Sequence, residues 1–529
     1  MIGGGPAASA VGRLLATWGH SVRILSRPAD RARGLAESLP PSTRKLLDTI
    51  GVLTDVERAG FYRSTGNTVW WGSHDRRVEM FDAGRTCGYQ VFRPDLDAVL
   101  LTSAAAAGAD VQSRAIVRSV TFAGDERASV TYEDAGGQTT ATCRVVLDCS
   151  GRAGVVARQY RRAHEAERMY AVVGVWQQQR GWNLPDETHT LVETYDDGWA
   201  WSVPISRSTR HVGTMIDPTF HAETAEHAET TLQVRRVLRG RLRRSGGARA
   251  LADAYRSEIG RTRQLDALVR DATLQHVFAC DASSYSSMVC AGPQFLLVGD
   301  AASFIDPLSS FGVKKALASA WLAAIVVHTA LIDPDRRAAA LGFFSQWERH
   351  AYLTHARQSR EFARAAFAHH PHPFWAMRAE RQIDPPVEVD EDDLVRDPGV
   401  QAAFDQLKQR PAVDFVLADG VRLARRPVIR GREIVLEDTF VASASPGAKS
   451  RREQSSKGEA SAEAASRTSP GLRFVGHVDL VKLADLACRH RQVPEIFEAY
   501  CRTCADVPLP SVLGGLSYLL AKGILKQRV

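Results

Sequence analysis

Three small residues at the start of the chain have the types and spacing needed to bind a phosphate-bearing ligand. Gly3, Gly5 and Ala8 fit the pattern G-x-G-x-x-G/A. The first glycine permits a tight turn, the second lets the backbone approach a pyrophosphate, and alanine lets the following helix pack closely on a sheet. The free amides at a helix start also favour negative charge. This stretch therefore predicts a dinucleotide-binding turn.

A second candidate site surrounds Asp300. The apolar run Phe295–Val298 followed by Gly299 predicts a buried strand that ends in a tight turn with a carboxylate. Such a carboxylate accepts hydrogen bonds from the hydroxyls of a sugar or polyol. Gly312 and Val313 then open an apolar, alanine-rich run, which predicts a buried helix whose first amides hold negative charge. The alternative to a cofactor cradle is an ordinary strand-loop-helix connection.

Other residues extend this cradle. Ser26 and Arg27 follow the predicted second strand, at the position where dinucleotide-binding folds carry an acidic residue for the ribose. Serine is able to bond a ribose, whereas arginine favours a phosphate. Arg93, before a predicted helix, is placed to bind a pyrophosphate with both arms of its guanidinium, or else is a surface residue at a helix cap.

Trp199 and Trp201 are candidates for the wall of a pocket. They lie in segment 168–216, whose alternation of apolar and polar residues predicts an antiparallel sheet. Side chains two residues apart share one face of a strand. The pair therefore lines a pocket for a flat ring or belongs to the core of the sheet.

The composition restricts the classes of function. With 44% hydrophobic and 24% charged residues, the 529-residue chain is typical of a globular protein with two or three domains. The net charge of +7 comes largely from scattered arginine and forms no long basic stripe, so we expect no nucleic-acid partner. Eight sparse cysteines predict a reducing cytoplasm. The apolar run after Lys315 predicts a core helix and no membrane span, and the histidines and cysteines have no standard metal spacing.

The glycine pattern, Arg93, the turn Asp148–Arg152 (DCSGR) and the stretch Val298–Val313 occur in that order. As a set they resemble the FAD-dependent monooxygenase superfamily over roughly residues 1–380, and most closely its flavin-dependent halogenase branch, which includes tryptophan halogenases and halogenase-like hydroxylases. Trp199–Pro204 (WAWSVP) resembles the family's W-x-W-x-I-P motif. The resemblance implies FAD as the cofactor. It implies that the residues lining FAD are Gly3, Gly5, Ala8, Arg93 and Asp300, with the loop Pro307–Val313 beside the flavin ring.

The expected fold is α/β, with a Rossmann-type three-layer FAD-binding domain and an interleaved antiparallel substrate-binding sheet. We assign residues 1–165 and 265–345 to FAD binding, 166–264 to the substrate sheet and its helices, and 346–385 to a helical region. Residues 386–441 and 472–529 form a small winged-helix-like appendage, and 442–471, rich in Ser, Ala, Lys and Glu, form a disordered linker. The strand expected before the glycines is missing, so we expect the natural start to lie upstream.

The chain departs from the family at residues that carry the chemistry. The family's catalytic lysine corresponds to Ser64, beside Arg63, and a loop glutamate of the tryptophan halogenases corresponds to Ser309. Serine cannot act as an amine, and arginine is always charged. We therefore predict an FAD-dependent oxidoreductase that hydroxylates an electron-rich aromatic group, through the flavin hydroperoxide that the family implies. Halogenation is the alternative on the same scaffold.

A flavoprotein that modifies an aromatic residue of a polypeptide is a further alternative. The C-terminal segments Val493–Tyr500 and Ser511–Leu525 are predicted helices, and they loosely resemble winged-helix modules that bind a peptide as an added strand. The alternative, which we favour, is a simple packing appendage. We expect a small aromatic substrate or a polypeptide as the partner. A separate flavin reductase is also expected, because no second dinucleotide pattern is visible.

Overall fold

The computed structural model describes residues 1–81, 86–124, 127–163, 168–217, 220, 234, 245–383, 397–409, 412–441, 473–475 and 477–528. The chain forms two compact units. The first consists of Met1–Ile332 and Leu341–Asp384, and the second of Asp333–Ala340 and Pro385–Val529. The predicted disordered linker, 442–471, lies outside the described residues. All the predicted cofactor and pocket residues belong to the first unit.

A short parallel sheet forms the centre of the first unit. Ile2 pairs in parallel with Leu25 on one side and Asp148 on the other, so this residue takes the central position where the sequence lacks a full strand. Its amide donates to the carbonyl of Leu147, and Gly3 donates to the carbonyl of Leu25. In order across this sheet, the strands are β7 (Asp110–Gln112), β1 (Arg23–Leu25), the bridge at Ile2, β11 (Val146–Asp148), β20 (Phe295–Leu297) and β19 (Ala291–Gly292).

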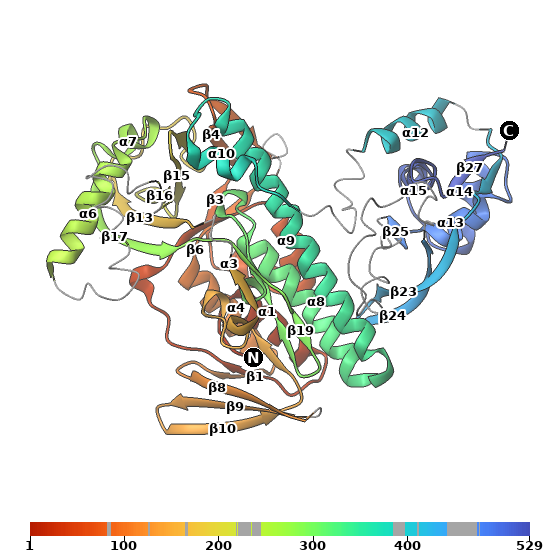
Figure 1. Ribbon diagram of the computed structural model, residues 1–529, viewed down its shortest axis with the longest axis horizontal. Helices are drawn as coiled ribbons and strands as arrows, with labels where there is room; N and C mark the ends of the chain where they lie inside the picture. Colours follow the sequence, from red (N-terminus) through yellow and green to blue (C-terminus); the bar gives the residue numbers. More distant parts are fainter. Residues whose placement is uncertain are drawn as a thin grey trace, which may run out of the picture. The chain divides into compact units, whose positions relative to one another are not determined.

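Three helices gather beside this sheet. Helix α1 (Pro6–Thr17) packs against both α4 (Arg93–Ala106) and α8 (Gly312–Ile332), near the N-terminus in Figure 1. Helix α8 is long and apolar enough to cross a membrane by those two criteria, but 72% of its most apolar window is buried within the protein. This burial is typical of a core helix.

A seven-stranded sheet forms the second layer of the first unit. Its strand order is β17–β13–β16–β15–β14–β4–β5. The strands are β4 (Gly66–Trp70), β5 (Arg77–Met80), β13 (Tyr170–Gln177), β14 (Thr190–Tyr195), β15 (Gly198–Pro204), β16 (Thr209–Ile216) and β17 (Thr273–Asp281). Segment 168–216 contributes four of them, and β13, β16, β15 and β14 pair antiparallel as predicted. The sheet also takes β4, β5 and β17 from outside the predicted range 166–264, so that range is too narrow.

The two faces of this sheet bury different clusters because side chains alternate along each strand. Val172 and Ala200 point into one core, with α6 (Ser245–Ile259) and α7 (Gln264–Val269). Val173 and Trp199 point into the other, with α9 (Arg337–Phe367) and α10 (Pro373–Ala379). Figure 1 shows α6 and α7 beside β13 and β17. The face with α9 and α10 carries both candidate tryptophans.

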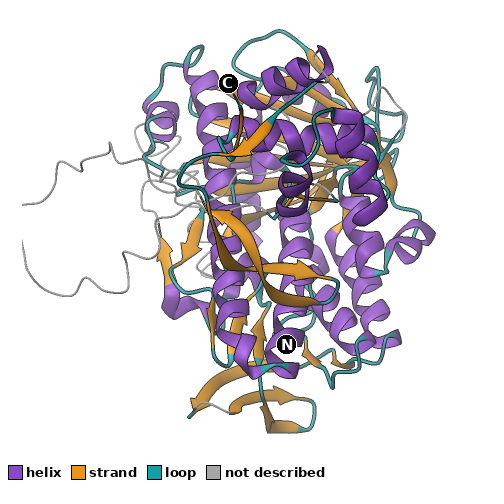
Figure 2. Cartoon of the chain, turned by 90° about the vertical axis from the view of Figure 1, so that its right-hand side faces the viewer, coloured by secondary structure: helices purple, strands orange, loops and turns teal. Residues whose placement is uncertain are grey.

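Smaller elements complete the first unit. Sheet β8–β9–β10 projects beyond the parallel strands in both Figure 1 and Figure 2. The remaining strands and helices are β2 (Ala36–Leu39), α2 (Thr43–Ile50), α3 (Leu53–Arg58), β3 (Tyr62–Ser64), β6 (Gly88–Phe92), β8 (Ile116–Ala123), β9 (Arg127–Asp134), β10 (Gly137–Cys143), β12 (Arg161–Ala163), β18 (Tyr285–Ser287) and β21 (Ser303–Phe304).

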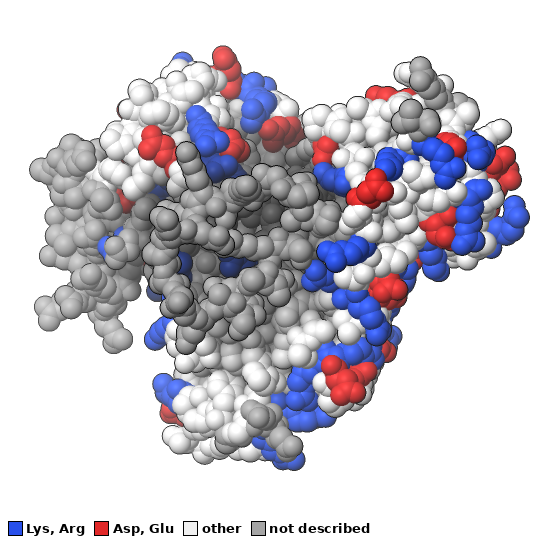
Figure 3. Space-filling view, turned by 45° about the vertical axis from the view of Figure 1, so that its right-hand side comes forward, with Lys and Arg blue, Asp and Glu red and all other residues white. Residues whose placement is uncertain are grey.

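The second unit has its own apolar core, built around Leu483, Ile496 and Leu516. Its helices are α12 (Pro398–Gln409), α13 (Leu480–Ala487), α14 (Val493–Thr503) and α15 (Leu509–Ala521). Its strands are β22 (Phe415–Leu417), β23 (Arg422–Arg430), β24 (Glu433–Val441), β25 (Phe474–Val475), β26 (Val478–Asp479) and β27 (Leu525–Gln527). In Figure 3 basic and acidic side chains are interspersed over the described part of the visible face.

Candidate functional site

The glycine turn before α1 leaves room for a ligand. Gly3 has a φ of +114°, and a Cβ there would overlap the carbonyl oxygen of Cys149, so only glycine fits. At Gly5 the atoms nearest to such a Cβ are side-chain atoms of Arg93 and Asp97, both 3.8 Å away. Helix α1 begins after Gly5 without a side-chain cap, which leaves its first amides available to an anion.

Arg93 lies beside this turn, as its predicted role requires, and is held between two carboxylates. Its Nη1 is 2.5 Å from Glu37 and its Nε is 3.2 Å from Asp97. Burial disfavours the charged form of Arg93, but the two carboxylates outweigh burial and raise its pKa. The guanidinium is therefore positioned and charged next to Gly5. Glu37 was missed by the sequence analysis because it lies 56 residues from Arg93.

The other predicted residues of this turn have different surroundings. Ala8 is fully buried in α1, as close helix packing requires. Ser26 is buried against the turn, where a Cβ on Gly4 would overlap its side chain, and its Oγ donates to the carbonyl of Arg27 at 3.3 Å. The Arg27 side chain is exposed. Ser26 therefore borders the glycine turn, and Arg27 lies at the surface.

Asp300 presents a buried carboxylate oxygen. The preceding Gly299 has a φ of +66°, and a Cβ there would lie 3.3 Å from Ala7 and 3.2 Å from Ala316, so the turn fits between α1 and α8. Among the described residues, Oδ1 of Asp300 has no hydrogen-bond partner. Burial raises the pKa of Asp300, and the charges of Lys315 and Arg93 oppose that rise. A buried acceptor without a donor is costly, so this oxygen fits the hydroxyl groups of a bound FAD.

A buried ion pair between Lys315 and Glu348 supports the Asp300 turn. Nζ of Lys315 donates to the carbonyls of Gly299 at 2.9 Å and Ser303 at 2.7 Å. The same nitrogen lies 3.8 Å from Glu348 of α9. Ser319 donates to the other oxygen of Glu348 and accepts from the Gly299 amide at 2.8 Å. The position of the turn therefore depends on side chains of both α8 and α9.

The loop that contains Pro307 forms part of the wall of a cavity of about 450 Å³. Trp199 of β15 lines this cavity, whereas Trp201 does not. Trp201 instead covers Gly213 on the neighbouring strand β16, where a Cβ would overlap its ring. Gly312 and Val313 begin α8 a few residues after the lining loop, with Val313 buried. The predicted tryptophan pair thus divides into one cavity residue and one packing residue.

Asp306 is the carboxylate in the wall of this cavity. Burial raises its pKa, while the amide of Leu308, which donates to its Oδ1 at 3.0 Å, and the charges of Arg378 and Arg381 oppose the rise. The carboxyl group of Asp306 is therefore suited to exchanging a proton. The sequence alone does not single out a proton donor or acceptor, although the pair Asp306-Pro307 is the available signal.

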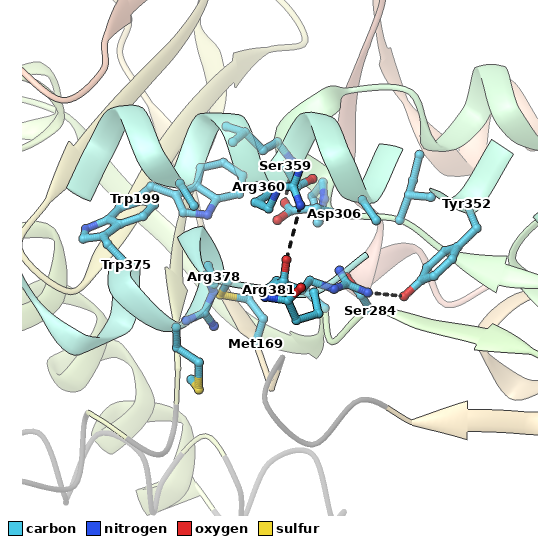
Figure 4. A pocket seen from close by; sticks show the side chains of 18 of the residues that line it. Met169, Trp199, Ser284, Asp306, Tyr352, Ser359, Arg360, Trp375, Arg378 and Arg381 are labelled. Atoms are coloured by element: carbon cyan, nitrogen blue, oxygen red, sulfur yellow. Dashed lines mark hydrogen bonds between the residues drawn. The ribbon is translucent and has the colours of Figure 1, made fainter. Parts of the chain in front are cut away.

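The remaining cavity wall comes largely from α9, α10 and the residues that follow. Figure 4 shows Trp199 and Trp375 close together at one end of the cavity and Tyr352 at the other. Arg381 donates to the hydroxyl of Tyr352 at 2.9 Å. The sequence analysis described this segment only as helical, and its aromatic and arginine content was the signal available there. Among the described residues, no group of three or more His, Cys, Asp or Glu side chains could hold a metal ion.

The fold and the site together define a flavoprotein with a dinucleotide-binding turn and a separate substrate sheet. The family model described as FAD binding domain matches residues 1–327. The chain therefore belongs to this family of FAD-dependent oxidoreductases, and its cofactor is FAD, as predicted. The α/β architecture with an FAD-binding domain is likewise confirmed.

The chain is similar in sequence to flavin-dependent halogenases. It is 29% identical over 352 residues to a tryptophan 2-halogenase from Chondromyces crocatus, a match that covers 65% of this chain and 64% of the relative. It is 25% identical to the flavin-dependent halogenase armH1 of Armillaria mellea, over 65% of this chain and 67% of the relative. The chain thus spans about two thirds of the length of these relatives.

Solved structures share the fold over nearly the whole chain. CmlS, a flavin-dependent halogenase, matches 99% of this chain and 95% of its own, with a TM-score of 0.72 and 21% identity. The peptidyl tryptophan dihydroxylase QhpG, essential for tryptophylquinone cofactor biogenesis, matches 99% of this chain and 98% of its own, with a TM-score of 0.63 and 19% identity.

Proposed function

We propose that the protein is an FAD-dependent monooxygenase that hydroxylates an electron-rich aromatic group in the cavity beside Trp199. The cavity volume of about 450 Å³ is within the range of small-molecule pockets, roughly 300–1,000 Å³. Its wall combines the rings of Trp199 and Trp375 with the polar groups of Asp306 and Tyr352. This mixture suits a flat substrate that must also be oriented.

The residues around the two turns bind the cofactor, whereas residues of the cavity exclude water and accept a proton. Gly3, Gly5, Arg93 and Asp300 would hold FAD, which when bound and reduced would supply two electrons for the activation of molecular oxygen. One oxygen atom replaces the hydrogen of an aromatic C–H bond as a hydroxyl, and the other leaves as water with two protons. Trp199 excludes bulk water from the cavity, and Asp306 accepts the proton released from the substrate.

One observation favours hydroxylation over halogenation. Ser64, at the position of the family's catalytic lysine, is fully buried in β3, and its Oγ lies 3.5 Å from the carbonyl of Gly66. No lysine is among the described residues that line the cavity. Lys315 is buried instead behind the Asp300 turn. An amine that carries or directs a halogenating species is therefore not supplied at the cavity, although the sequence relatives are halogenases.

The test compares products with and without halide. The FAD-loaded protein is supplied with oxygen, an aromatic substrate, and a reduced nicotinamide dinucleotide, either alone or with a flavin reductase, in buffers with and without bromide. We expect a product heavier by one oxygen atom, at a rate independent of bromide, as measured by mass spectrometry. A brominated product, formed only with bromide, would establish halogenation instead. Rapid reduction of FAD by the reduced nicotinamide dinucleotide alone would exclude the separate reductase that we propose as a partner.

A polypeptide substrate is the second candidate. The peptidyl tryptophan dihydroxylase aligns with both units, including the C-terminal one. In that unit β23 and β24 pair only with each other among the described strands, and Leu423 of β23 is 51% exposed. An open strand edge beside an exposed apolar side chain suits the addition of a peptide strand.

We place either activity in the reducing cytoplasm, in keeping with the eight free cysteines.

A further inference from the structure

The cavity wall carries more guanidinium groups than carboxylates. Arg162 of β12, Arg360 of α9, Arg378 of α10 and Arg381 line the cavity, and Asp306 supplies the one carboxylate among the described lining residues. In Figure 4 the labelled arginines lie around the middle of the cavity.

Carboxylates just outside the wall reduce this excess without removing it. Asp217 binds Arg378 at 2.8 Å. Glu361 is shared, since it lies 2.9 Å from Arg364 and 3.4 Å from Arg360. These described neighbours and the lining residues together give five guanidinium groups and three carboxylates. Like charges in a partly desolvated cavity disfavour one another unless an anion joins them.

Arg360 is the guanidinium most readily available to such an anion. Its contacts with the Arg381 carbonyl and with Glu361 are all 3.4 Å long. That distance exceeds the usual 2.7–3.2 Å of an N–H···O bond. Its side chain is 22% exposed, at the cavity wall. Because these bonds are weak, little is lost when the guanidinium turns toward a ligand.

One end of the wall is aromatic. Trp199 and Trp375 lie there, and Met169 and Met377 also line the cavity. Aromatic faces and thioethers pack well against a flat ring. The cavity therefore combines a site for a ring with a site for negative charge.

We propose that the substrate is an aromatic compound that carries an oxyanion, a carboxylate or a phosphate, which binds Arg360 and Arg381 while its ring lies against Trp199 and Trp375. The planar fork of arginine matches both groups bidentately. This inference rests on the proposed aromatic substrate, and it adds the charge that the substrate must have.

The test is a binding measurement that requires no turnover. The full-length, FAD-loaded protein is titrated in halide-free buffer, by isothermal titration calorimetry, with indole-3-acetate and indole-3-acetamide, with 4-hydroxyphenylacetate and its amide, and with phenyl phosphate. We expect an acid or the phosphate to bind about tenfold or more tightly than the uncharged amides. Tighter binding of the acids identifies a carboxylate, and tighter binding of phenyl phosphate identifies a phosphate.

Variants assign the preference to the wall. Arg360→Gln removes the charge and should abolish the preference, whereas Arg360→Lys keeps the charge without the fork and should retain part of it. Arg58→Gln, at an exposed position paired with Asp55 and outside the cavity wall, is the control and should retain the full preference. Bound FAD in each variant verifies the fold.

Two outcomes would overturn the inference. Equal affinity for acids and amides, or a preference that survives in Arg360→Gln and in Arg381→Gln, would refute the anionic group while leaving an aromatic substrate in place. Failure of every ring compound to bind the wild-type protein would refute both this inference and the proposed small aromatic substrate.

Discussion

Two aspartates in the first unit are buried for different purposes. Asp300 has an oxygen without a donor in the described structure, which suits a ligand hydroxyl. Asp306 is already bonded by the amide of Leu308 and lies in the cavity wall. Burial raises the pKa of both, so each takes up a proton at higher pH than an exposed aspartate. Only Asp306 is placed to exchange that proton with a substrate.

Asp306→Asn should lower kcat by roughly 10²- to 10⁴-fold, the usual contribution of a general base. The carboxylate is the active form, so the wild-type rate should rise with pH through a pKa above the ordinary value of 3.8 and then level off. Asparagine keeps an oxygen for the Leu308 amide and should preserve the loop. The pH dependence of kcat/KM for both proteins measures this effect. A variant that retained both the rate and the acidic limb would assign the proton to another group.

At the scale of residues, the sequence predicted those residues whose role depends on their immediate neighbours in the chain. The spacing of Gly3 and Gly5 indicated the turn, because backbone geometry there depends on adjacent residues. It did not indicate Glu37 as the partner of Arg93, or Arg360 as part of a cavity, because those contacts join distant segments. Trp199 and Trp201 were correctly assigned to one face of a strand. Periodicity could not show that only one of them reaches the cavity.

At the scale of elements, the Asp300 turn depends on two helices that meet at a buried ion pair. Lys315 of α8 and Glu348 of α9 are both almost completely inaccessible to solvent. Burial raises the pKa of Glu348, and the Lys315 charge opposes that rise. Neither residue lines the cavity, so their substitution tests support of the turn without removing a cavity side chain.

Lys315→Met should destabilise the fold by about 3–5 kcal/mol, because it leaves the Glu348 carboxylate buried without its cation. The double variant Lys315→Met/Glu348→Gln should lose less than the sum of the two single variants. Urea unfolding of the four proteins measures the coupling. A Glu348 pKa raised in the folded state means that folding binds a proton, so stability falls as pH rises from 4.5. The Lys315→Met penalty should therefore shrink in acid, and additive effects at all pH values would refute the ion pair's role.

The substrate sheet shows why element boundaries were harder to predict than element types. The alternation in segment 168–216 correctly predicted an antiparallel sheet, because residues two positions apart in a strand share a face and pack into the same cluster. Strands β4, β5 and β17 join the sheet through pairings with distant segments, such as Thr190 with Asn67 and Tyr170 with Asp281. Sequence patterns carry little information about such pairings.

At the scale of the whole molecule, the division into two units separates the site from the C-terminal unit. The FAD turns and the cavity lie entirely within the first unit. The second unit has a core of its own. Residues 333–340 cluster with the second unit, where Arg336 binds Glu433 at 2.8 Å. This partly exposed pair contributes about 1 kcal/mol at most.

A protein truncated after residue 384 should keep its FAD and bind small aromatic acids with affinities within about threefold of the full chain, because no described cavity residue is removed. The ratio of flavin to protein absorbance and calorimetric titration measure these properties. Activity on a polypeptide should be lost if the second unit recognises it. Full polypeptide activity in the truncated protein would make the C-terminal unit a packing appendage, and loss of FAD would show that the two units depend on each other for stability.

Helix α9 carries Glu348, which braces the FAD turn, and, one turn further along, Tyr352, which lines the cavity and binds Arg381. A rigid helix that contacts both places transmits a shift at one end to the other. Substrate and FAD are then heterotropic effectors of each other, and the free energy of this coupling is reciprocal. Whatever factor the substrate contributes to FAD affinity, FAD must contribute to substrate affinity, so the affinities of the apoprotein and the flavoprotein for the aromatic acid would differ by that same factor.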